Sequence, residues 1–180
     1  MTQEPSLEGG FVSNDIKFPK IWAGYIFAVL FFIFEIVELS IHPDLAEKTP
    51  DPLIIIISIG AYIYWLFCVY KIHNILDKVT MHKYPIPSWK AVVYHFIPFY
   101  NIFYWIFKWP GGIVNFINNA GKTKMLKKWL PGLLLLCGML TGRVIDGAVG
   151  LAVIFYVLSY LVKNMKKVLR EATVPIESLK

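Results

Sequence analysis

The stretch YPIPSWKAVVYHFIPFYNIFYWIFKW, residues 84–109, decides how this 180-residue chain is arranged. Eleven of its residues are Phe, Tyr or Trp, and proline interrupts it at Pro85, Pro87 and Pro98. Proline inside a helix removes a backbone hydrogen bond and clashes with the preceding turn. We therefore expect two short helical stretches, 89–97 and 99–108, each too short to cross a bilayer.

Longer apolar runs lie on both sides of this aromatic segment. Two precede it, at 21–41 and 52–70, and two follow it, at 128–141 and 145–162. About 20 helical residues, at 1.5 Å each, match a hydrocarbon layer of about 30 Å. The third run is short, which favours local thinning of the bilayer or packing without tilt. These four runs predict transmembrane helices.

The segments between and after these runs have a more polar, helical pattern. Residues 71–81 read as an amphipathic continuation of the second run, and KNMKKVLREA follows the fourth run as a helix end. Gly111 and Gly112 open a polar-apolar stretch that predicts a separate interfacial helix followed by a basic turn. The chain is 57% hydrophobic, so residues 1–180 are expected to form one integral membrane domain. Its ends are a polar arm, 1–17, and a polar tail, 171–180.

The distribution of basic residues chooses between two topologies. With four spans, 16 of the 18 Lys and Arg residues lie on one side, and only Lys48 and Arg143 lie on the other. If residues 84–109 also crossed, the division would be 7 against 11. Because cytoplasmic loops carry an excess of Lys and Arg, the four-span arrangement is favoured. The sequence thus predicts an all-α fold with four transmembrane helices and cytoplasmic termini. A re-entrant or interfacial aromatic helical hairpin lies between the second and third helices.

One face of the first run carries small residues followed by carboxylates. Successive spacings of 4, 3, 4, 3 and 4 join Gly24, Ala28, Phe31, Glu35, Glu38 and His42. Acids within a membrane are costly and usually face the bundle interior or water. Glu35 and Glu38, with Arg143 and Asp146, are therefore candidates for an ion or proton pathway. The structural alternative is a salt bridge from Arg143 to Glu35, unless Asp146 satisfies Arg143 locally.

His95, Pro98 and Asn101 mark the break in the aromatic segment. We expect them to take up backbone groups that the break releases, with a ligand cleft as the alternative. A haem held by His73 and His95 is geometrically conceivable. No histidine or cysteine spacing is typical of a metal site, and the sequence predicts neither a metal nor a cofactor.

Glycine pairs mark the last two apolar runs. Gly138 in the third run and Gly142 just past its end stand four residues apart, and Gly147 and Gly150 begin the fourth run. Small residues at this spacing let helix backbones approach closely. We expect such an approach between these two helices and also between protomers.

The aromatic segment resembles one found in small uncharacterised bacterial polytopic membrane proteins. The matching residues are Lys90, Ala91 and Val92, followed by Ile97, Pro98, Phe99, Asn101, Tyr104 and Trp105 in an I-P-F-x-N-x-x-Y/F-W pattern. The resemblance covers about 25 residues. It implies a location in the bacterial cytoplasmic (inner) membrane and an intramembrane aromatic element, and it implies no activity.

The function classes that remain are limited by what the sequence lacks. It contains no nucleophile elbow, zinc-protease helix motif or phosphate-binding loop, so we predict that it is not an enzyme. It has no nucleic-acid-binding motif, and its net charge of +6 fits anionic lipid. The prediction is a non-catalytic membrane protein that forms a homo-oligomer or is an accessory subunit of a larger membrane complex. An ion or proton permeation protein is the main alternative, and an enzyme acting on lipid is the third.

Overall fold

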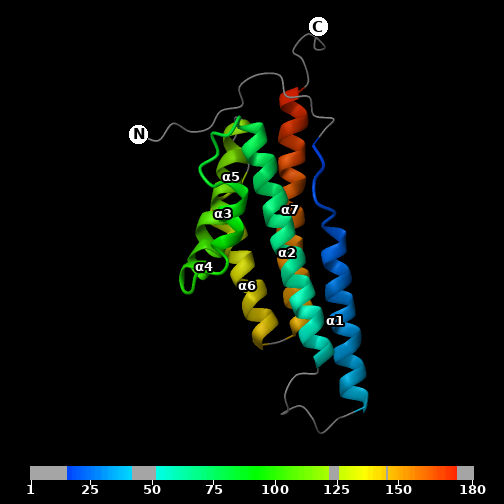
Figure 1. The fold of residues 1–180 in the computed structure, drawn as a ribbon. Coiled ribbons are helices and arrows are strands. Elements are labelled where there is room, and N and C mark those ends of the chain that lie inside the picture. The colour runs from blue at the N-terminus through cyan, green and yellow to red at the C-terminus, as the bar shows by residue number, and fades with distance from the viewer. Residues whose placement is uncertain (1–15, 42–51, 122–125, 145, 174–180) are drawn as a thin grey trace.

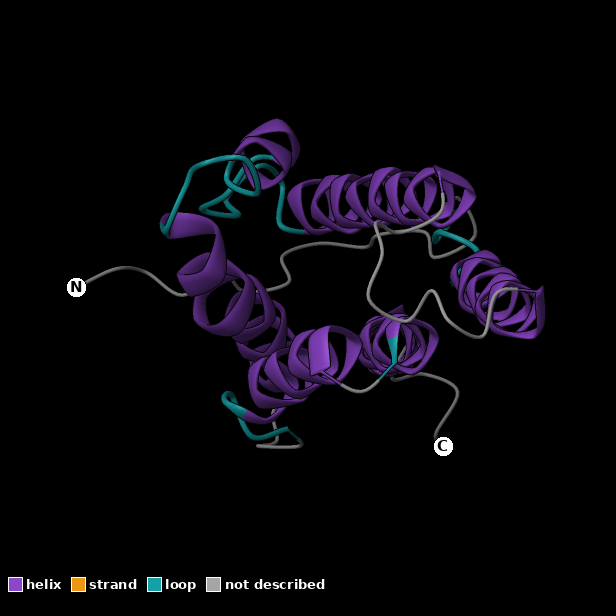
Figure 2. Ribbon diagram, turned by 90° about the horizontal axis from the view of Figure 1, so that it is seen from below, coloured by secondary structure: helices purple, strands orange, loops and turns teal. Residues whose placement is uncertain are grey.

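A computed structural model describes residues 16–41, 52–121, 126–144 and 146–173. Within these ranges the regular secondary structure is all helix, with no strand, and loops join the helices, as Figure 2 shows. The helices in chain order are α1 (Trp22–Ile41), α2 (Pro52–Val79), α3 (Ser88–Val93), α4 (Tyr100–Phe103), the π-helix η3 (Tyr104–Lys108), α5 (Trp109–Ala120), α6 (Leu130–Val144) and α7 (Gly147–Thr173). The prediction of an all-α fold is confirmed for this part of the chain.

Three of these helices, α1, α2 and α7, are long and apolar enough to cross a membrane. That number and composition are typical of a multi-pass membrane protein. α2 continues without a break through the wetter segment 71–79, as its helical periodicity predicts. α7 likewise extends well past the apolar run 145–162. α6 is apolar but shorter than a full span.

The aromatic segment folds back on itself beside the long helices (Figure 1). α3 leads away from the end at which α2 finishes, α4 lies part of the way along the bundle, and α5 returns toward that same end. We call the region from Ser88 to Ala120 the aromatic hairpin. α6 contacts both η3 and α5, so the hairpin lies along the continuation of this short helix. The hairpin therefore fills the length of the bundle that α6 leaves free.

α7 packs against α1 through two reciprocal glycine–phenylalanine contacts. A side chain added at Gly24 of α1 would overlap the ring of Phe155 in α7, and one added at Gly147 of α7 would overlap the ring of Phe31. Gly24, Ala28 and Phe31 are the buried residues of α1. The small-residue face predicted for the first run is thus the face that packs.

α6 and α7 approach still more closely. The backbone of Gly150 lies directly against that of Gly142, so position 150 has no room for a larger residue without a shift. Lipid tails are as apolar as leucine, so helices in a membrane associate largely through such van der Waals contact. The predicted close approach of these two helices is confirmed.

The second half of the aromatic hairpin differs from the sequence prediction. We expected a stretch ending at 108 and a separate helix from Gly111, but η3 and α5 form one continuous path to Ala120. The prediction failed because a π turn accommodates the proline at Pro110. The Trp109 N–H donates to the carbonyl of Tyr104, five residues back. Such wide turns occur mostly as single insertions within α-helices.

Pro110 also explains a glycine in the neighbouring helix. Without an N–H, Pro110 cannot donate to the carbonyl of Ile106, four residues earlier. That carbonyl oxygen lies against Gly132 of α6, where a Cβ atom would overlap it. Gly132 therefore lets α6 dock on the backbone of η3.

Candidate functional site

The interior beside the aromatic hairpin contains a buried histidine enclosed by aromatic rings. His95 follows α3 and is only 2% exposed. Its Nδ1 lies 2.7 Å from the Ala91 carbonyl, and its Nε2 lies 3.3 Å from Nε1 of Trp65 in α2. A carbonyl can only accept and an indole N–H can only donate. His95 is therefore the neutral tautomer with its proton on Nδ1, and it joins α3 to α2.

Two hairpin residues complete the surroundings of His95. The rings of Tyr104 and Trp105 stand edge-on to the imidazole, with centroids 5.3 and 5.4 Å away. Burial in these surroundings lowers the pKa of His95 to about 4. We call Trp65, His95, Tyr104 and Trp105 the His95 cluster. The predicted role of His95, a hydrogen bond to a carbonyl near the helix break, matches this geometry.

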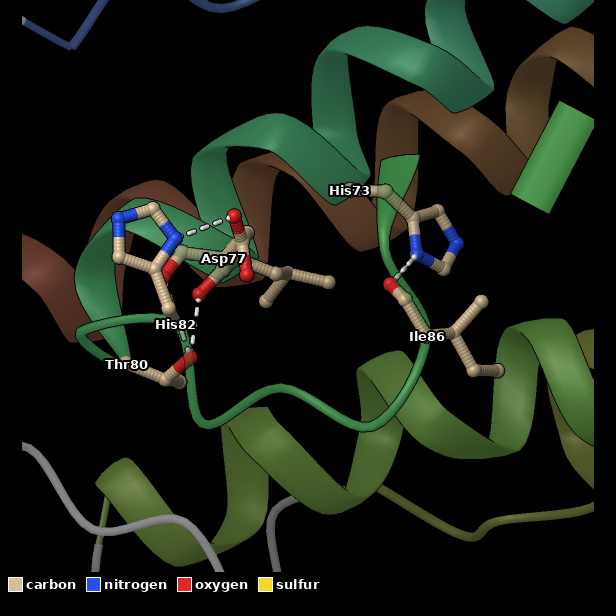
Figure 3. A network of polar contacts seen from close by, with 6 residues as sticks. His73, Asp77, Thr80, His82 and Ile86 are labelled. Carbon is tan, nitrogen blue, oxygen red and sulfur yellow. Dashed lines mark hydrogen bonds and ion pairs between the residues drawn. The ribbon is translucent and has the colours of Figure 1, made fainter. Parts of the chain in front are cut away.

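His73 lies in α2 nearer the end of the bundle and is fully buried. Its Nδ1 is 3.3 Å from the carbonyl of Ile86 in the α2–α3 linker, as Figure 3 shows. Its Nε2 is buried and has no hydrogen-bond partner in the described chain. The ring of Tyr84 stands edge-on to it at 5.4 Å, and burial raises the pKa of Tyr84. A haem joining His73 to His95 would have to displace Trp65 or the Ala91 carbonyl, because both nitrogens of His95 are engaged.

A local network closes α2 just beyond His73 (Figure 3). Nδ1 of His82 lies 2.7 Å from the Asp77 carboxylate, and the Thr80 hydroxyl donates to the Leu76 carbonyl at 2.8 Å. Met81 and His82 have positive φ, and the His82 N–H donates to the Asp77 carbonyl. This left-handed ending is a recurrent way to terminate a helix. It turns the chain so that Ile86 meets His73.

Glu35 lies at the opposite end of the bundle, against the start of α7. Its carboxylate accepts a hydrogen bond from the Gly147 backbone N–H and lies near Asp146. One of its oxygens, Oε2, is buried without a partner among the described residues. Asp146 also serves α7, since its Oδ1 accepts from the Val149 N–H at 2.8 Å. Carboxylates are stabilised at a helix N-terminus by its unpaired N–H groups and dipole.

The other members of the predicted pathway are less closely associated. Glu38 is half-buried, one turn beyond Glu35 on the same face of α1. Arg143 is exposed near the end of α6, and no ion pair joins it to Glu35 or Asp146 in the described part of the chain. The structure thus brings Glu35 and Asp146 together around α7, and does not place Arg143 between them. His42 lies outside the described residues.

Pro98 and Asn101 lie at the tip of the aromatic hairpin, away from the buried imidazole of His95. Backbone hydrogen bonds close the break here, with the Asn101 N–H donating to the Ile97 carbonyl at 2.9 Å. The Asn101 side chain makes no hydrogen bond with another described residue. Phe99, between the two, has a φ of +61° and is 90% exposed. These residues do not form one cleft with His95.

Sequence reasoning missed the residues that hold His95 in place. Trp65 lies in an uninterrupted apolar run, where nothing distinguishes an indole that donates a hydrogen bond from one that faces lipid. Tyr104 is equally inconspicuous among eleven aromatic residues, yet it is fully buried and its hydroxyl has no described partner. The available signal was the helix break itself, because a buried polar side chain near released carbonyls needs a second element to pair with.

In comparisons with known proteins, no protein-family model, curated protein or solved structure matches the chain.

Proposed function

We propose that the chain is a four-span protein of the bacterial inner membrane, with both termini cytoplasmic and the aromatic hairpin re-entrant. The arrangement in Figure 1 supports this, because the hairpin starts and finishes at the end where α2 and α7 finish. The contact of α6 with η3 and α5 also supports it. The short fourth span, α6, and the hairpin together then fill the thickness of the membrane.

Single-cysteine labelling tests this topology. Cys68 and Cys137 are first replaced by Ala, and Lys83→Cys and Asn119→Cys are then made separately, just before the aromatic hairpin and at its end. Both positions are exposed. A membrane-impermeant maleimide should label the two cysteines from the same, cytoplasmic face. Labelling from opposite faces would show that the hairpin crosses.

Within this topology, the proposed function is a non-catalytic subunit that assembles with other copies of itself through the tip of the aromatic hairpin. The observation that carries the proposal is Phe99. A bulky residue at a positive φ costs about 1–3 kcal/mol. Phe99 is 90% exposed, so little contact within its own protomer offsets that cost. A contact with a second protein accounts for both the strained backbone and the outward ring.

The surface around Phe99 is suited to such a contact. Large apolar side chains are exposed along the tip and the adjoining helix: Phe96, Ile97, Ile102, Phe103 and Phe107. The rings of Phe103 and Phe107 lie 5.3 Å apart, which fixes part of this surface in advance. Rigid aromatic side chains give contact area at a low cost in conformational entropy, and they dominate many interfaces.

Phe99→Gly separates assembly from folding. Glycine adopts a positive φ freely, so the substitution should raise the melting temperature of the dispersed protein while it weakens association. The matched control is Phe32→Ala, which removes an exposed ring from α1. Subunit number is measured by photobleaching of the labelled protein in vesicles. If Phe99→Gly leaves the oligomer distribution unchanged, the tip is not the assembly contact. If oligomers form only with a co-purified protein, the chain is an accessory subunit.

One observation favours ion or proton permeation as a second candidate. Several polar atoms in the described interior are buried and unpartnered: Glu35 Oε2, His73 Nε2, Tyr104 Oη, Trp109 Nε1 and Asn115 Oδ1. Buried groups of this kind commonly bind ordered water. A cavity of about 280 Å³ between α2, α6 and α7 reaches Trp65 of the His95 cluster. The test is proton flux in vesicles carrying Glu35→Gln together with Glu38→Gln. A flux that the double substitution abolishes would replace the assembly proposal with this one.

A further inference from the structure

A second surface feature, unrelated to the hairpin tip, lies where α2 passes into the aromatic hairpin. A groove of about 730 Å³ separates the α2–α3 linker at 83–86 from η3 and α5. Residues Lys128 and Trp129, just before α6, form its third side. We call this the α5 groove. Its size lies within the range of small-molecule sites.

The polar part of the α5 groove is basic. Lys83, Lys108 and Lys128 line it, and no Asp or Glu is among its described lining residues. Lys108 and Lys128 are both exposed, so their ammonium groups can turn toward a ligand. Like charges converging on a hollow attract and concentrate an anion.

The rim of the α5 groove is apolar. Phe107 and Trp129 expose more than half of their surfaces beside the lysines. A free anion in water would gain nothing from these rings, whereas the acyl chains of a lipid would cover them. The groove also lies at the end of the bundle where we place the cytoplasmic surface, at the depth of lipid headgroups.

An unpartnered amide lies within the α5 groove. Oδ1 of Asn115 is buried and has no hydrogen-bond partner among the described residues. An acceptor left unpaired in the interior is unfavourable. A small turn of the Asn115 side chain toward the groove would let a hydroxyl group on a ligand donate to this oxygen.

One of two adjacent glycines leaves the floor of the groove accessible. A Cβ atom at Gly112 would come within 2.8 Å of the Tyr84 hydroxyl, while one at Gly111 would meet nothing within 4 Å. Gly111 thus leaves open space at the backbone of α5, against which a ligand can lie.

We propose that the α5 groove binds an anionic glycerophospholipid with a hydroxyl-bearing headgroup. Its phosphate lies between Lys108 and Lys128, its headgroup hydroxyl donates to Asn115, and its acyl chains cover Phe107 and Trp129. The proposal is tested separately from assembly through the hairpin tip, since the two surfaces share only Phe107, and the lysines, Gly111 and Asn115 belong to the groove alone.

The test measures lipid retained by the full chain in native mass spectra, after purification in detergent with phosphatidylglycerol or phosphatidylcholine. Lys108→Gln with Lys128→Gln should lower phosphatidylglycerol retention about tenfold, because each lysine near a lipid surface contributes appreciably. The matched control is Lys163→Gln with Lys167→Gln. These two lysines line another basic groove, between α7 and the start of α1.

Gly111→Leu is the steric variant. It fills the open space of the α5 groove, keeps every charge and strengthens the helix, so folding should be preserved while lipid retention falls. Equal losses in both lysine pairs would overturn the proposal, as would full retention in Gly111→Leu or equal retention of phosphatidylcholine. Binding of glycerol 3-phosphate but not of phosphatidylglycerol would also overturn it, because the ligand would then be a free anion.

Discussion

Two regions of the molecule hold their segments together in different ways: the glycine-packed interface of α1, α6 and α7, and the ring-packed aromatic hairpin. At the first, the backbones of Gly142 and Gly150 touch, and no polar side chain takes part in that contact. At the second, the rings of Trp65 and Trp105 lie 4.9 Å apart, and a hydrogen bond to His95 accompanies them. Glycine packing tolerates no added atom. Ring packing tolerates gaps but brings N–H and O–H groups inside, and these need partners.

The largest expected effect comes from adding atoms at the glycine-packed interface. Gly150→Leu would force its side chain into the backbone of Gly142, which cannot move aside without separating α6 from α7. We expect a loss of about 3 kcal/mol or more in the free energy of unfolding. Unfolding in a detergent titration measures this loss. Gly111→Leu, in open space, is the control, and an equal loss in both variants would contradict the steric account.

The corresponding loss in the hairpin comes from removing a polar group. His95→Ala deletes a buried ring and leaves the Trp65 N–H without its acceptor. A destabilisation of about 2–3 kcal/mol is expected. His82→Asn, at an exposed position that also needs a positive φ, should change stability by less than about 0.5 kcal/mol. A stability of His95→Ala close to that of the native chain would mean that ring contacts alone hold the hairpin.

These two regions also differ in how far the sequence predicted them. Hydropathy and periodicity predicted the long helices and the packed face of Gly24, Ala28 and Phe31, because lipid burial leaves a regular pattern. They did not predict η3, since a wide turn depends on how one carbonyl, that of Ile106, finds room beside Gly132. Pairing between distant segments, such as Trp65 with His95, leaves no local trace.

Acid should weaken the hairpin through His95. The pKa of His95 lies near 4 in the folded chain and near its ordinary value of about 6.5 when unfolded. The folded state therefore favours neutral His95, so its contribution is complete above pH 6.5 and is lost as the pH falls toward 4. At pH 5.5 the loss is on the order of 1 kcal/mol.

The pH effect is measured as the difference between two melting curves. His95→Gln cannot gain the proton, and it shares every other titrating group with the native chain. Stability of the native chain should fall more steeply between pH 6.5 and 4.5 than that of the variant. Parallel curves would show that protonation of His95 is not linked to folding.

The smallest expected effects distinguish two explanations of what stabilises the bundle at the Glu35 end. One is the carboxylate at the N-terminus of α7, and the other is a salt bridge to Arg143. Glu35→Ala removes an acceptor from the N-terminus of α7 and should cost about 1 kcal/mol. Arg143→Ala should change stability by less than about 0.5 kcal/mol, because the arginine is exposed and forms no ion pair with a described residue. Melting temperatures of both variants in detergent test this order. A larger loss for Arg143→Ala would restore the salt bridge that the sequence suggested.

The π turn at η3 is equivalent to one residue inserted into an α-helix. If residues 104–108 wound as an ordinary α-helix instead, everything beyond them would be rotated by about 100°. Trp109, Ile113 and Ile117, now buried, would then swing out of the core. The length of this one turn, more than any single side chain in it, sets which face of α5 the protein turns inward.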